Sequence, residues 1–220
     1  MRSSTPDQAF RGSGRYPYWM PKIRAASIDE HKELTRRALL ESAYQVIADA
    51  GSAEVPLGEI ALLAGVGRTT FYDYFDDRED VIAALVEEKL PDVIADLIAS
   101  VPDELDSPER LVWLASKTVE FVATDQVLGV ILHREVGRMG VEAQKRIERS
   151  HSQLAIELAS IYQKGVDEGV FVEMPHYLAG RLIQDTIMSA ARVLIDDETR
   201  LTAVTEGVRS FLLGGLRGIG

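Results

Sequence analysis

The sequence predicts an all-α protein, and three observations support this fold class. Apolar residues recur at spacings of three and four along most of the chain, as they do on one face of a helix. No stretch shows the polar and apolar alternation of a half-buried strand, and no internal repeat is found. Within residues 57–76, two short apolar segments meet at Gly65-Val66-Gly67, a turn signal. We therefore expect a helix-turn-helix unit near the N-terminus of a helical chain.

The other helices are predicted from their apolar stripes and from the Gly or Pro residues beside them. The first is expected at residues 28–50, because a broad apolar stripe ends there at Gly51. A helix from Arg78 is expected to kink or restart at Pro91 and to reach Ser100. Further helices are expected at residues 108–124, 125–139, 141–168, 175–196 and 199–216.

The turn residues indicate which face of the second motif helix is free. Gly65 can take the left-handed conformation that ends the first helix. Phe71 and Tyr74 continue the apolar face of the second helix, so its other side chains point outward. These outward residues are Arg68, Thr69, Thr70 and Asp73. Arg and Thr at the N-terminal end of such a helix suit entry into a DNA major groove. The simpler alternative is an ordinary helical hairpin.

Three segments around this motif resemble the DNA-binding domain of the tetracycline-repressor (TetR) family. They are RRALLESAYQVIADAG at 36–51, GEIALLAGVGRTTFYDYF at 58–75 and REDVIAAL at 78–85. The aromatic cluster at residues 71–75 is the most specific part. Ser or Thr is usual in the family near residues 55 and 56, where this chain has Val55 and Pro56, and Ser is common at 67, where it has Gly67. Both motif helices are therefore expected to lack a hydroxyl cap.

The resemblance implies a dimeric, ligand-responsive transcriptional regulator, most often a repressor, released from a palindromic operator by a small-molecule effector. It also assigns roles to particular residues of the head. Arg68, Thr69 and Thr70 would meet base edges. The residues expected to contact phosphates are Thr35, Arg37, Tyr72, Tyr74 and Arg78.

Composition and the resemblance together divide the chain into three parts: a basic flexible arm at 1–27, a helix-turn-helix domain at 28–80, and a helical ligand-binding and dimerisation domain at 81–220. Core packing is the simpler interpretation of any single aromatic or Met in the last part. The expected ligand-binding residues are Trp113, Phe121, His133, Met139, Tyr162 and Met188. The last two helices would pair across a two-fold axis, or else merely close the core of the monomer. Their expected interface residues are Leu182, Ile187, Val208, Phe211 and Leu212.

Composition limits the other possibilities. The 220 residues carry a net charge of −11 and contain no Cys. Residues 1–80 carry −3 and residues 81–220 carry −8, so most of the acidity lies outside the motif region. A groove-binding protein needs a local basic surface rather than a basic total, and we expect modest non-specific affinity for DNA. No apolar segment is long enough for a membrane span or a signal peptide, which predicts a cytoplasmic protein without membrane partners.

The first 27 residues are rich in Gly, Pro and Ser, and hold five Lys or Arg against one Asp. One interpretation is an arm that follows the DNA backbone or enters the minor groove. The equally supported alternative is a solvated tail, or an extension upstream of a true start at Met20.

No motif supports an enzyme. The four His are far apart in sequence, and HREVG at 133–137 lacks the second His of a metalloprotease helix. No nucleophile elbow, phosphate-binding loop or nucleotide fingerprint is present, and no metal site or cofactor is expected. The main alternative function is an all-α interaction protein of the same fold that does not bind DNA, which the acidic balance favours. The operator, the regulated genes, the effector and the choice between repressor and activator stay open.

Overall fold

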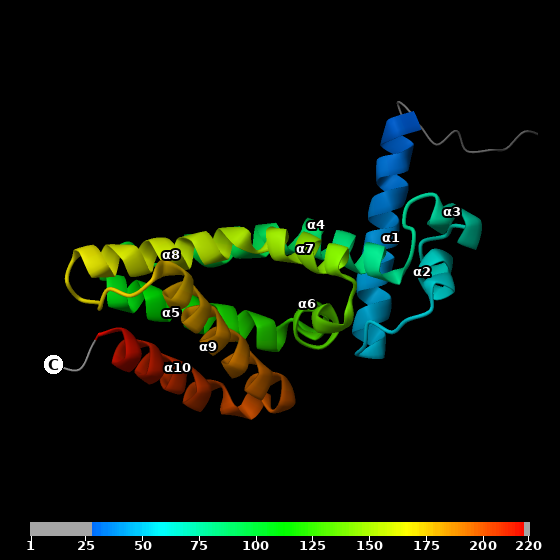
Figure 1. The fold of residues 1–220 in the computed structure, drawn as a ribbon. Helices are drawn as coiled ribbons and strands as arrows, with labels where there is room; N and C mark the ends of the chain where they lie inside the picture. The colour runs from blue at the N-terminus through cyan, green and yellow to red at the C-terminus, as the bar shows by residue number, and fades with distance from the viewer. Residues whose placement is uncertain (1–27, 218–220) are drawn as a thin grey trace, which may run out of the picture.

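The computed structural model describes residues 28–217, and these contain helices and their connections but no strand (Figure 1). The head consists of α1 (Ile28–Ala50), α2 (Leu57–Leu63) and α3 (Arg68–Tyr72). The long helix α4 (Arg78–Ala99) leads from the head into the body. The predicted all-α fold class is confirmed. The predicted arm at 1–27 lies outside the described residues.

The body is elongated and extends away from the head (Figure 1). Its first part comprises α5 (Ser107–Thr124), α6 (Gln126–Val130), a π-helical turn (Ile131–Glu135) and a 3-10 turn (Val136–Arg138). Its second part comprises α7 (Val141–Ser150), α8 (Ser152–Asp167), α9 (His176–Asp196), a 3-10 turn (Glu198–Arg200) and α10 (Leu201–Leu216). Helices α7 and α8 run beside α4, and α5 packs against α8, α9 and α10. Within residues 28–217, no helix has both the length and the apolar character needed to cross a membrane.

The helix expected at 141–168 is interrupted at His151, which separates α7 from α8. His151 has φ −110° and ψ 9°, outside the helical region. Its ring Nδ1 lies 2.8 Å from the carbonyl oxygen of Ile147, and the hydroxyls of Ser150 and Ser152 donate to carbonyls of α7. Short polar side chains that bond to nearby backbone groups compete with regular helix. The prediction of one continuous helix was therefore wrong at this point.

Two other predicted boundaries also change. Helix α4 continues through Pro91 as one helix, so Pro91 does not restart it. The segment expected as a helix at 125–139 begins as α6 and then becomes a π-helical and a 3-10 turn. Gly129 makes this segment possible, because a Cβ on it would lie 2.3 Å from the carbonyl oxygen of Val122 on α5.

The buried side chains form two clusters, and one of them crosses from the head into the body. This first cluster includes Leu39 and Phe71 of the head together with Ile131 and Ile147 of the body, all at most 1% exposed. The second cluster joins α5, α8, α9 and α10. The proposed domain boundary at residue 80 therefore lies inside a continuous core, so the body is packed directly against the base of the head.

Candidate functional site

The turn between α2 and α3 holds the second motif helix on the head. Gly65 has φ 71°, the left-handed conformation expected of it. The N–H of Val66 donates to the carbonyl of Ala61 at 3.0 Å. On the inner face of α3, Phe71 is fully buried, and its ring centroid lies 5.6 Å from that of Phe75. These contacts fix the inner face of α3 and leave its outer face free.

The outer face of α3 presents the three residues expected to read bases. Arg68 and Thr69 are exposed, and Thr70 is half-buried. All three lie in the first turn of a five-residue helix that begins after Gly67 without a side-chain cap. A guanidinium can bond two acceptors of guanine, and a Thr can contact a base edge or the methyl group of thymine.

Three of the expected phosphate contacts are available on the surface of the head. Tyr72 is exposed and packs edge-on against Phe71, which orients its ring. Tyr74 is half-buried, and Arg37 is exposed on α1. Arg37 comes from α1, Tyr72 from the end of α3 and Tyr74 from the turn that follows it, so together they could fix the register of α3 on a duplex.

The other two expected phosphate contacts already have partners within the chain. The hydroxyl of Thr35 donates to the carbonyl of His31 at 2.9 Å, as a Thr inside a helix often does. A nitrogen of Arg78 lies 4.0 Å from a carboxylate oxygen of Glu54, at the limit of an ion pair. Arg78 is therefore easier to redirect toward a phosphate than Thr35 is.

A cavity of about 350 Å³ opens between α4, α5, α8 and α9 in the body. Leu90, Ile94 and Leu97 line it from α4, and Leu154, Ala155 and Leu158 line it from α8. Its polar lining residues are Thr118, His151, Tyr177, Arg181 and Gln184. Among the described residues that line it there is no Asp or Glu, although the chain has 35 of them. The lining is that of a site for an apolar or amphipathic molecule without positive charge.

The six predicted ligand-binding residues do not surround one cavity. Phe121 and Met188 line the cavity described above. Trp113 lies in a separate groove between α5 and α10, where the ammonium of Lys117 sits 5.7 Å from the centre of its ring. The hydroxyl of Tyr162 donates to the carbonyl of Val172 at 2.9 Å and accepts from the N–H of Met174. Met139 belongs to the cluster that joins head and body.

His133 lies away from the cavity, on the π-helical turn that faces the end of α1. Both of its ring nitrogens are buried and have no hydrogen-bond partner within residues 28–217. Burial lowers the pKa of His133, and the positive charge of Arg192 lowers it further. The imidazole is therefore held in its neutral form.

We expect acid to destabilise the protein through His133. A lowered folded-state pKa means that its contribution to stability is complete above the unfolded value of about 6.5 and is lost as the pH falls through the folded value. Urea unfolding at pH 7.5 and at pH 5 measures how much unfolding free energy is lost on acidification. This loss should be smaller for His133→Phe than for the parent. An equal loss in both proteins would contradict this assignment.

The expected interface residues separate into two groups. Ile187, Val208 and Leu212 are at most 4% exposed and pack in the core of their own protomer. Leu182 of α9 and Phe211 of α10 are 45% and 64% exposed. Only the second group, among these five described residues, can make a large contact with another chain.

Comparison with known proteins supports the interpretation of the head. Residues 39–85 match the model of bacterial regulatory proteins of the tetR family. The chain is 26% identical over 181 residues to the fatty acid metabolism regulator protein of Bacillus subtilis, covering 81% of this chain and 93% of the relative. The structure of the B. subtilis regulator FadR in complex with stearoyl-CoA superposes with a TM-score of 0.69 at 25% identity, covering 81% of this chain and 98% of that one.

Residues 39–85 therefore form a DNA-binding domain of the tetR type. The whole chain is a DNA-binding transcriptional regulator, as the sequence predicted. A third relative, the transcriptional repressor LfrR of Mycolicibacterium smegmatis, is 48% identical over 54 residues, or 24% of this chain and 28% of that one. These relatives are named as regulators rather than as enzymes.

Proposed function

We propose that this regulator acts as a homodimeric repressor that binds a palindromic operator and is released by a small-molecule effector. Its two α3 helices would enter successive major grooves, with Arg68, Thr69 and Thr70 against base edges. Exposure of Arg68 and Thr69 at the start of a firmly packed α3 is the observation that carries this proposal. Tyr72, Tyr74, Arg37 and Arg78 would contact phosphates, as would Thr35 after release from its carbonyl.

We propose that the dimer forms through the exposed faces of α9 and α10. On α9, Leu178, Leu182 and Val193 are exposed large apolar residues. On α10, the exposed face around Phe211 carries small residues, namely Ala203, Gly207, Ser210 and Gly214. Small residues let two helices approach closely, and a two-fold axis would place each patch against its own copy.

The cavity between α4, α5, α8 and α9 is the proposed effector site. The B. subtilis relative FadR has been seen with stearoyl-CoA, so an amphipathic acyl compound is the first candidate for this cavity. The apolar residues of α4 and α8 would surround the acyl chain, while Arg181 and Gln184 would face a polar group. A compound bound in this cavity would favour a distance between the two heads of the dimer that does not fit successive major grooves of DNA.

Selection of duplexes from a random pool tests the proposed function directly. The protein should enrich an inverted repeat, with binding that weakens as salt is raised. Stearoyl-CoA added to the complex should release the selected duplex if acyl compounds are effectors. A pool without enrichment would instead favour the interaction protein of the same fold, which the net charge of −11 permits.

Filling the cavity is expected to block effector response without loss of DNA binding. Gly180 of α9 lines the cavity, and a Cβ on it would meet nothing within 4 Å. Gly180→Phe should therefore occupy the cavity and weaken stearoyl-CoA binding at least about tenfold, since the acyl chain would lose apolar contact. Gly180→Ala is the matched control and should stabilise α9 by about 1 kcal/mol. Titration calorimetry on both variants checks this, and equal stearoyl-CoA affinity would place the site elsewhere.

A further inference from the structure

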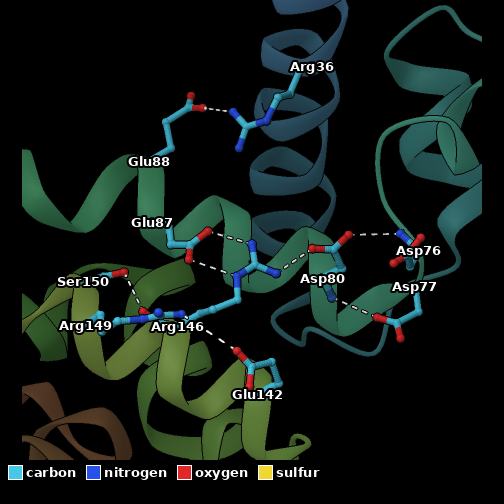
Figure 2. Close-up of polar contacts among 10 residues, drawn as sticks. All are labelled: Arg36, Asp76, Asp77, Asp80, Glu87, Glu88, Glu142, Arg146, Arg149 and Ser150. Carbon is cyan, nitrogen blue, oxygen red and sulfur yellow. Dashed lines mark hydrogen bonds and ion pairs between the residues drawn. The ribbon is translucent and has the colours of Figure 1, made fainter.

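Arg146 joins the body to the base of the head (Figure 2). This residue of α7 extends its guanidinium to two carboxylates of α4. Its Nε and Nη2 donate to the two oxygens of Glu87 at 2.9 and 2.6 Å, and its Nη1 donates to Oδ1 of Asp80 at 2.6 Å. The hydrogen bonds from Arg146 lower the pKa of Glu87. A bidentate, charge-assisted contact of this kind fixes direction as well as distance.

Asp80 carries the connection onward to the motif. While its Oδ1 accepts from Arg146, its Oδ2 accepts from the backbone N–H of Asp76 at 3.0 Å. Asp76 directly follows Phe75, the buried residue that packs on Phe71 of α3. One carboxylate therefore links the body to the chain segment that leaves α3 (Figure 2).

A second contact holds the same two helices together. The carboxylate of Glu79 in the first turn of α4 accepts from the N–H of Gly140 at 2.8 Å, at the start of α7. On the opposite side of α4, Glu88 accepts from Arg36 of α1 at 3.0 Å. Glu87 thus binds α4 to the body, and the next residue, Glu88, binds α4 to the head. A rotation of α4 against α7 would therefore change the contacts of α4 with both parts.

Arg146 also lies five residues before His151, which lines the cavity. The Nδ1 of His151 bonds to the carbonyl of Ile147, the residue after Arg146. The interruption between α7 and α8 occurs at this same His151. A molecule that displaces His151 or the start of α8 would move α7 and redirect the guanidinium of Arg146.

We propose that Arg146, although it belongs to the body, is a positioning residue for DNA reading: through Asp80 and Asp76 it sets the orientation of α3 relative to α4. This inference rests on the proposed DNA-binding function. Loss of Arg146 removes the cation shared by Asp80 and Glu87, and the carboxylate of Asp80 then holds the N–H of Asp76 without the contact that orients it. The affinity for operator then falls while the base preferences, which depend on Arg68 and its neighbours, are unchanged.

Hydrogen exchange on the full-length protein tests the inference without DNA or effector. In Arg146→Gln, peptides covering residues 68–82 should exchange about tenfold faster, the effect of losing a charge-assisted hydrogen bond. Peptides from α9 and α10 should keep their protection. Arg146→Lys keeps the charge but not the bidentate geometry and should be intermediate. Arg149→Gln is the matched control, since Arg149 is 70% exposed and lies 4.0 Å from its partner Glu142.

A second variant separates positioning from charge balance. Arg146→Gln combined with Asp80→Asn and Glu87→Gln removes the uncompensated carboxylates together with the guanidinium. If Arg146 positions the head, this triple variant should regain thermal stability but keep the fast exchange at residues 68–82. On the duplex selected by the parent it should bind about tenfold more weakly, with the same base preferences.

Three results would overturn the inference. The first is unchanged exchange at residues 68–82 in a folded Arg146→Gln protein. The second is a triple variant with parental exchange and parental operator affinity, which would reduce Arg146 to charge compensation. The third is uniform loss of protection along the whole chain in both variants, which would make it a general stabilising residue. Failure of the parent to select any duplex would refute the proposed function, whereas the exchange result would still decide, without DNA, whether Arg146 orients α3.

Discussion

Leu182→Asp combined with Phe211→Asp is expected to convert the proposed dimer into monomers and to reduce operator affinity at least about 100-fold. The reason is that linking two heads gives the second head a high effective concentration at its half-site, which a single head lacks. These two side chains are exposed on α9 and α10, so the change should leave the protomer folded. Like charges facing each other across a two-fold axis would oppose association on both patches. Sedimentation velocity gives the oligomeric state, and a duplex titration gives the affinity.

The control for this variant is Ile156→Asp. Ile156 is 68% exposed on α8, outside the proposed interface, so this variant should remain a dimer with parental affinity. Leu212 is unsuitable for the test, because it is 3% exposed in the core of its own protomer and an Asp there would unfold the chain. A dimer that survives the changes at Leu182 and Phe211 would place the interface elsewhere.

Local signals in the sequence were sufficient to predict most of the fold. Gly51 ends α1 and Gly65 ends α2, and both have positive φ, as a helix end of this kind requires. The break at His151 was missed because it arises from bonds between side chains and nearby carbonyls, which leave the apolar spacing of α7 and α8 unchanged. Apolar periodicity reports the buried face of a helix and is insensitive to such a break.

The candidate sites were predicted unevenly, for a related reason. Outward residues of α3 follow from the turn and from the inward position of Phe71, so Arg68 and Thr69 could be predicted from a short segment. The cavity is built by helices far apart in the sequence. Leu90 and Ile94 of α4 meet Leu154 of α8 there, and an apolar side chain beside a cavity looks in sequence like any core residue. Phe121 and Met188 were identified, whereas His151 and Gln184 were missed.

The contacts of Arg146 could not be predicted from the sequence either. Asp80 and Glu87 lie seven residues apart, so they share one face of α4, but nothing in the pattern names their partner. That partner is supplied by a helix about sixty residues later, after the chain has passed through α5 and α6. Such pairings depend on tertiary packing and become visible only in the structure.

Arg68→Ala is expected to weaken specific DNA binding by about 1–3 kcal/mol, or roughly 5- to 150-fold, and to relax the preference at one position of each half-site. The physical reason is that an exposed guanidinium at the start of α3 can bond two acceptors of a single guanine, whereas Ala can bond none. Arg37→Ala is the matched control. Arg37 is exposed on α1, and its loss should weaken binding to all sequences alike. It should also reduce the slope of log affinity against log salt concentration by about 1. Repeating the duplex selection with both variants separates the two roles, because only a base-reading residue changes which sequences are enriched. If Arg68→Ala enriched the same half-site with parental affinity, the reading of bases would have to be assigned to Thr69 and Thr70 instead.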